Sequence, residues 1–83
     1  MRAYEVPKHN SAIQRGRVMM AIEGNAYRLQ LLSTAMVENG FPSTQCADTG
    51  DKDGEIIEYF IISRADKKDF MSTYKLNKKD ITA

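Results

Sequence analysis

Apolar residues recur every three to four positions through the first half of the chain. At this spacing they line one face of an α-helix, and they comprise Val18, Met19, Ile22, Ala26, Leu29, Leu32 and Met36. One helix over 11–39 would be about 42 Å long, against roughly 25 Å expected across so small a domain. Gly24-Asn25 offers a break, because Gly favours a helix C-terminal cap and Asn an N-cap. The pattern therefore predicts helices over 11–23 and 26–39, with one continuous helix as the alternative.

Three shorter segments favour β-structure. Residues 3–6 alternate weakly before Pro7, and residues 43–48 are typical of an edge strand. Residues 55–62 place Ile, Tyr and Phe on both faces, which predicts a central, largely covered strand. The Gly- and Asp-rich residues 50–54 between these last two predict a turn.

A third helix is predicted to begin at Ser63, which stands three residues before Asp66 in the spacing of a capping box. Phe70 and Tyr74 lie four residues apart and would press this helix onto the sheet. The polar residues 76–83 are expected to form a frayed tail. Met20 falls off the main apolar stripe; core packing is the favoured interpretation, and an exposed contact surface is the alternative.

The predicted fold is a single α+β domain over residues 1–83, in the order β-α-α-β-β-α. An antiparallel-rich sheet of two or three strands would pack against the helices. A chain of 83 residues fits one domain. No run of 18 apolar residues exists, so no membrane span is expected. The lone Cys46 excludes an intramolecular disulfide, and these features together favour a cytoplasmic protein.

The charges are segregated along the chain although the net charge is only +1. Residues 1–35 carry five basic and two acidic groups, a net +3. Residues 36–58 carry six acidic groups and one lysine, a net −5, and residues 59–83 carry six basic and three acidic groups, again +3. This segregation indicates a charged contact surface.

No set of residues in the chain points to catalysis, a cofactor or a metal. A nucleophilic Cys46 would need an imidazole base, and His9 is the only histidine. The acidic neighbours of Cys46 would also raise its pKa and suppress the thiolate. Residues 49–60 fail as a calcium loop, because Thr49 and Phe60 stand where carboxylates are required. Neither a Walker loop nor a dinucleotide fingerprint is present. We therefore expect a protein that is not an enzyme.

The leading functional hypothesis is a small protein-binding module, an inhibitor or adaptor. Its acidic face would dock on a basic surface of a partner, such as a nucleic-acid-handling complex. A chain encoded by a phage or another mobile element, for example an anti-defence protein, would suit this description. A homodimer formed through an edge strand is a further hypothesis. The predicted contact residues are Asp48, Asp51, Asp53, Glu55 and Glu58.

The alternative is a small DNA-binding transcription regulator resembling a winged helix, with helix 26–39 as the reader. The candidate nucleic-acid contacts are Arg15, Arg17, Arg28, Gln30, Ser33 and Thr34. The acidic hairpin counts against this hypothesis, because a wing lies against phosphates. The lysines at 67, 68, 75, 78 and 79 are typical of a solvated helix end, and contact with RNA or DNA is the less favoured interpretation of them.

Overall fold

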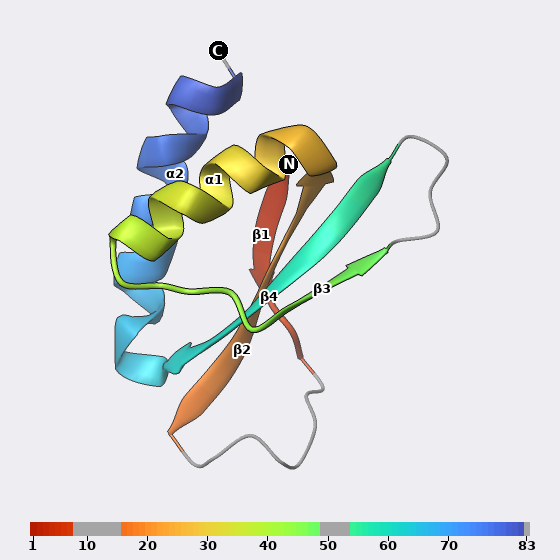
Figure 1. The fold of residues 1–83 in the computed structure, drawn as a ribbon. Coiled ribbons are helices and arrows are strands. Elements are labelled where there is room, and N and C mark those ends of the chain that lie inside the picture. The colour runs from red at the N-terminus through yellow and green to blue at the C-terminus, as the bar shows by residue number, and fades with distance from the viewer. Residues whose placement is uncertain (8–15, 49–53, 83) are drawn as a thin grey trace.

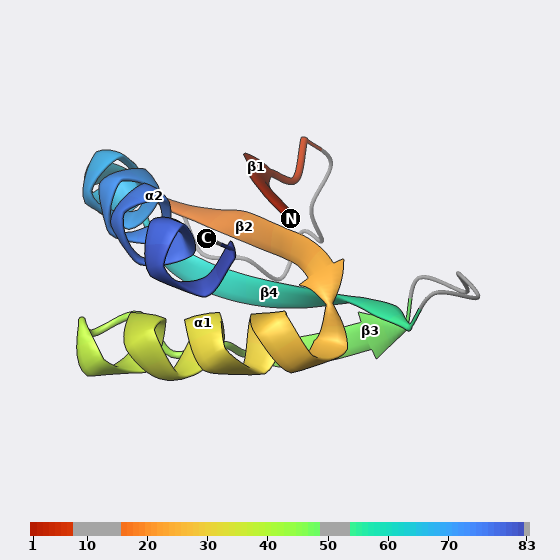
Figure 2. The same ribbon diagram turned by 90° about the horizontal axis from the view of Figure 1, so that it is seen from above.

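The computed structural model describes residues 1–7, 16–48 and 54–82, without the side chains of Asp48 and Thr82. Its elements, in order, are β1 (Arg2–Glu5), β2 (Arg17–Asn25), α1 (Ala26–Glu38), β3 (Gln45–Asp48), β4 (Glu55–Ser63), a short 3₁₀ helix η1 (Arg64–Asp66) and α2 (Lys67–Thr82). The strands form one antiparallel sheet in the order β1-β2-β4-β3. Both helices lie on the same side of this sheet (Figures 1 and 2). The predicted α+β class is confirmed. The sheet has four strands instead of two or three, and the element order is β-β-α-β-β-α instead of β-α-α-β-β-α.

The predicted helix over 11–23 is wrong where the structure describes it, because residues 17–25 form strand β2. Val18, Met20 and Ile22 alternate along β2 and are fully buried. β2 pairs with β4 along its whole length, from Arg17 opposite Ser63 to Asn25 opposite Glu55. A strand with apolar residues on both faces also places some of them three or four apart, so its pattern resembles that of a helix.

The predicted helix over 26–39 is confirmed as α1. The Oδ1 atom of Asn25 accepts hydrogen bonds from the backbone N–H groups of Tyr27 and Arg28, at 3.0 and 3.4 Å. The helix ends in a Schellman motif, in which the Gly40 N–H donates to the Val37 carbonyl and the Phe41 N–H to the Met36 carbonyl. Gly40 has a φ of +90°, which glycine adopts without strain. Gly24-Asn25 is thus a junction between a strand and a helix.

The hydrophobic core lies between the helices and one face of the sheet. The buried side chains come from β2, α1, β4 and α2: Val18, Met20, Ile22, Leu29, Leu32, Met36, Phe60, Ile62, Phe70 and Tyr74. The ring of Phe70 meets the rings of Phe60 and Phe41 edge to face, with centroids 5.1 and 5.4 Å apart. The expectation that Phe70 and Tyr74 press the last helix onto the sheet is confirmed, and Met20 belongs to the core.

The C-terminal residues differ from the prediction in two ways. Residues 76–82 are not a frayed tail, because α2 continues to Thr82. Ile81 lies seven residues after Tyr74, on the same helix face, and packs against the core. Ser63 precedes η1 without a side-chain capping bond, so the predicted capping box is also wrong. No helix among the described residues is long and apolar enough to cross a bilayer.

The register assigns every strand residue to one of two sheet faces, because side chains alternate along a strand. Val18, Met20, Ile22, Phe60 and Ile62 face the helices. The opposite face, which we call the open face, carries Met19, Ala21, Ile57, Tyr59 and Ile61 in the centre of the sheet. The predictions of a central strand at 55–62 and an edge strand at 43–48 are confirmed by β4 and β3.

Candidate functional site

The predicted acidic residues do not gather on one described surface. Asp51, Asp53 and the side chain of Asp48 lie outside the described residues. Glu55 pairs with Asn25 and shares the parity of the open face, whereas Glu58 pairs with Ile22 on the helix side. Glu58 is only 5 % exposed, so the prediction that this carboxylate faces solvent is wrong. Hence Glu55 and Glu58 contribute to opposite faces of β4.

Glu58 lies opposite Cys46 in the β3–β4 pair. Partial burial of the Cys46 thiol raises its pKa, and the Glu58 carboxylate raises that pKa further through its charge and a hydrogen bond. A raised pKa reduces the thiolate fraction, so Cys46 is not primed as a nucleophile. The Oε2 atom of Glu58 is buried and has no hydrogen-bond partner among the described residues. His9, the other candidate for such chemistry, lies outside those residues.

A polar network joins β1 to β2 at one end of the open face. The Arg2 Nε atom donates to Glu23 Oε1 at 2.7 Å, and the Tyr4 hydroxyl donates to Glu23 Oε2 at 3.0 Å. The Arg2 guanidinium also lies 4.7 Å from the centroid of the Tyr4 ring. The hydrogen bond from Arg2 is the main reason that the pKa of Glu23 is lowered, and burial is the main reason that the pKa of Tyr4 is raised. The network therefore favours an ionised Glu23.

We expect Glu23→Gln to be less stable than the wild type by about 0.2–1 kcal/mol at neutral pH, the range for exposed ion pairs. The pKa of Glu23 is lowered in the folded state. The ionised carboxylate therefore stabilises the fold at pH values above its ordinary pKa near 4.5. That stabilisation is lost as the pH falls through the lowered pKa. Urea unfolding of both proteins between neutral and strongly acidic pH measures the difference. A stability difference between the two proteins that persists at strongly acidic pH would contradict this role of the Glu23 carboxylate.

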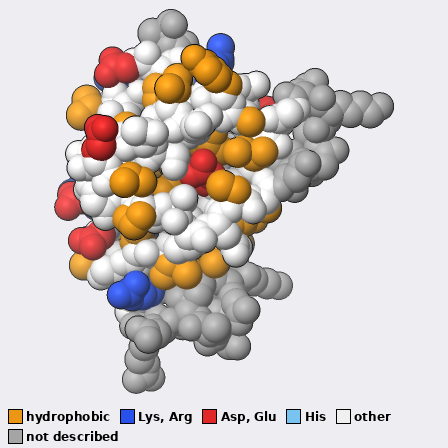
Figure 3. All heavy atoms as spheres, in the orientation of Figure 1, with side chains coloured by type: hydrophobic (Ala, Val, Ile, Leu, Met, Phe, Trp, Pro, Cys, Tyr) orange, Lys and Arg blue, Asp and Glu red, His pale blue; other side chains and the backbone are white. Residues whose placement is uncertain are grey.

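The structure brings together only part of the candidate DNA-reading set, because Gln30, Ser33 and Thr34 share one side of α1. Arg28, Gln30 and Thr34 are exposed on α1, Ser33 is half-buried, and Arg15 lies outside the described residues. The described residues do not form the two-helix outline of a winged helix, because strand β2 directly precedes α1. Arg17 stands at the far end of β2, roughly 26 Å along the strand from Asn25 at the start of α1. The surface over α1 shows lysine and arginine only at its margins (Figure 3).

α2 instead gathers basic side chains on one of its faces. At 3.6 residues per turn, its five lysines fall within about one third of the helix circumference. Asp69 and Asp80 fall on the other side of the helix, and Phe70 and Tyr74 bury a third face. Arg64 in η1 extends the row at its N-terminal end. We call this surface the basic face; its residues are Arg64, Lys67, Lys68, Lys75, Lys78 and Lys79.

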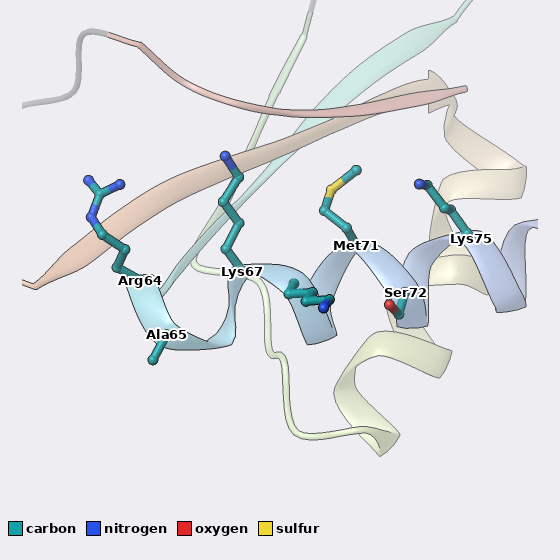
Figure 4. A pocket seen from close by; sticks show the side chains of 7 residues that line it. Arg64, Ala65, Lys67, Met71, Ser72 and Lys75 are labelled. Carbon is teal, nitrogen blue, oxygen red and sulfur yellow. The ribbon is translucent and has the colours of Figure 1, made fainter.

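A hollow of about 530 Å³ lies along the N-terminal half of the basic face. Arg64, Lys67, Met71 and Lys75 project from the same side of the helix around it (Figure 4). Its full lining is Arg64, Ala65, Lys67, Lys68, Met71, Ser72 and Lys75. The hollow thus combines four cations, one hydroxyl and the apolar side chains of Ala65 and Met71.

Most cations of the basic face are not neutralised within the described part of the chain. The Nζ atom of Lys67 pairs with Glu5 Oε1 at 3.0 Å, and Lys78 lies 5.7 Å from the centroid of the Tyr74 ring. Within the described ranges, no ion pair involves Arg64, Lys68, Lys75 or Lys79. These four residues are spaced by four, seven and four positions, a helical spacing that the sequence shows, although the polar residues 76–83 predict a frayed tail.

The described side chains hold no group of three or more His, Cys, Asp and Glu residues placed to bind a metal ion. Among the described residues, the candidate functional site is therefore the positively charged basic face. No protein-family model, curated protein or solved structure matches this chain.

Proposed function

We propose that the protein is a small nucleic-acid-binding module that holds the phosphate backbone on the basic face of α2. The observation that carries the proposal is the segregation of charge around this helix, with its lysines on one face and its aspartates on another. Arg64, Lys68 and Lys75 border one open hollow and form no ion pair with any described residue. They are therefore available to an anionic ligand.

The dimensions of the face suit a phosphate chain. From Lys67 to Lys79 the helix rises about 18 Å at 1.5 Å per residue. Phosphates recur along one strand of a duplex about every 3.4 Å of its axis, so several lie within reach of flexible lysine side chains. The hydroxyl of Ser72, which also lines the hollow, adds a neutral hydrogen-bond donor.

The residue types favour phosphate over an acidic protein as the ligand. Lysine is depleted in the cores of protein–protein interfaces, where Tyr, Trp and Arg are enriched. All five cations of α2 are lysines, and no aromatic side chain lines the hollow. Lysine presents a point charge rather than a planar fork that reads a base edge. We therefore expect binding that depends little on nucleotide sequence.

The test is fluorescence anisotropy with labelled 20-nucleotide RNA and a 20-base-pair DNA duplex, at several salt concentrations. We expect the logarithm of the affinity to fall linearly with the logarithm of salt, with a slope of about −3 to −4 for four phosphate contacts. The double substitution Lys68→Glu/Lys75→Glu should weaken binding at least about tenfold and flatten the slope. Both side chains are exposed, so the fold should be retained.

Two control variants make the same kind of charge reversal elsewhere. Arg28→Glu changes an exposed residue on α1, and Arg17→Glu changes an exposed residue at the start of β2. Each should change affinity by less than about threefold, through net charge alone. A loss from Arg28→Glu as large as that from the α2 variant would favour α1 as the reader. Absence of salt-dependent binding to either probe would overturn the proposal.

Docking of a protein partner on the acidic residues stays a separate prediction. The specific observation that favours it is the net −5 of residues 36–58. Its test is partner capture by the wild type and by a variant with Asp51, Asp53 and Glu55 changed to lysine. Equal capture by both proteins would remove this hypothesis, together with the inhibitor or adaptor role that it implies.

A further inference from the structure

The basic face of α2 has carboxylates at both of its long edges. Asp69 and Asp80 lie on one side, about one third of a turn around the helix from the middle of the face. On the other side, nearest the sheet, the Glu5 Oε1 atom of β1 lies 3.0 Å from the Nζ atom of Lys67. The cations therefore form a strip along the helix, with acidic groups on either side of it.

The charges of the two aspartates are not neutralised within the described part of the chain. Asp69 and Asp80 are exposed, and neither forms an ion pair with a described residue. They are separated by about 16 Å along the helix axis, so they accompany most of the basic face. Acidic side chains follow the left margin of Figure 3, where α2 and the end of α1 lie in Figure 1. A phosphate chain displaced toward this side would meet negative charge.

The width of the strip fits one phosphate chain. One third of the circumference of a helix 10–12 Å across spans a chord of about 10 Å. A duplex presents two phosphate chains, separated by grooves of about 6 and 12 Å. When one chain lies along the middle of the basic face, the second is therefore displaced toward Asp69 and Asp80 or toward Glu5. The screening length at physiological salt is about 8 Å, so these carboxylates still repel the second chain.

The lining of the hollow also suits an unpaired strand. A duplex stacks its bases inside, whereas a single strand exposes base faces that side chains can contact. Ala65 and Met71 provide apolar contact between the cations of the hollow. Arg64 provides a guanidinium plane, on which bases stack. The hollow therefore matches a ligand that offers phosphates and base faces together.

We propose that the basic face selects a single-stranded nucleic acid over a duplex, because Asp69 and Asp80 repel the second strand. This inference rests on the proposed function and names the class of ligand for the same site. Asp69 and Asp80 are specificity-determining residues in it. They weaken binding of the wrong ligand and do not hold the right one.

The test is fluorescence anisotropy with a labelled 20-nucleotide DNA strand and with the duplex of that strand and its complement, in one buffer. Charge density alone favours the duplex, which carries twice as many phosphates per length as each of its strands. We nevertheless expect the wild type to bind the single strand about tenfold more tightly. Asp69→Asn/Asp80→Asn should raise the affinity for the duplex about tenfold and that for the single strand less than about threefold.

Glu55→Gln is the control, because it removes an acidic charge on the open face, and should change both affinities by less than about twofold. Circular dichroism establishes that every variant is folded. A wild type that binds the duplex as tightly as the single strand overturns this selection and leaves nucleic-acid binding in place. Equal gains for both probes in the asparagine variant overturn the role of Asp69 and Asp80. Absence of binding to both probes overturns the proposed function, and this inference with it.

Discussion

Phe70→Ala is expected to lower the free energy of unfolding by about 3–5 kcal/mol, the range for truncating a fully buried phenylalanine. Phe70 has no exposed surface and meets both Phe60 on β4 and Phe41 after α1. Its removal leaves a cavity where α2, the sheet and the segment after α1 converge. The lost edge-to-face contacts add to the loss of buried area.

Such a loss is large for a domain of 83 residues, whose total stability is expected to be about 4–12 kcal/mol. Urea denaturation followed by circular dichroism measures it. Leu76→Ala is the matched control on the same helix, because Leu76 is 69 % exposed, and should change stability by less than about 0.5 kcal/mol. Equal effects of the two substitutions would show that α2 is not anchored through Phe70.

Glu58→Met is expected to raise the free energy of unfolding by about 1–3 kcal/mol, because a buried polar atom without a partner carries a cost of that size. Glu58 is 5 % exposed, and its Oε2 atom finds no partner among the described residues. Methionine has a similar length and no polar group to desolvate. It would extend the apolar row that Ile22 and Phe60 already form on the helix side of the sheet.

A second measurement reports on the same contact. Because Glu58 raises the pKa of Cys46, Glu58→Met should lower that pKa and increase the rate at which the thiol reacts with a disulfide reagent at neutral pH. Glu58→Gln is the control, since it removes the charge but keeps a buried polar group, and should speed this reaction without stabilising the fold. A destabilised Glu58→Met would show that the carboxylate is satisfied in solution.

The basic face could have been predicted from the sequence alone. At 3.6 residues per turn, its lysines fall on one helix face and Phe70 and Tyr74 on a second. The aspartates Asp69 and Asp80 fall on a third face. The sequence instead predicts a frayed tail over residues 76–83, because a polar segment at the end of a chain is typical of fraying. The packing of Ile81 against the core holds the last turns, and that contact depends on the position of the sheet.

The acidic face illustrates the opposite case. Neighbouring carboxylates in a sequence suggest one charged surface, yet the period of two in a strand sends Glu55 and Glu58 to opposite sides. No composition-based reasoning separates them. The separation needs the register of β4 against β2 and the knowledge of which side the helices cover.

The sequence by itself determined the local features of this protein, namely α1 with its Asn25 cap and Gly40 stop, strands β3 and β4, and the aromatic anchor of α2. These depend on hydrogen bonds and side-chain spacings within a few residues. Only the tertiary structure decided that residues 17–25 form a strand, that Glu58 is buried and that one sheet face is open. Each of these follows from pairing between β2 and β4, whose paired residues are thirty or more positions apart in the chain. The hydrogen bonds of this pairing outweigh a weak local helical pattern.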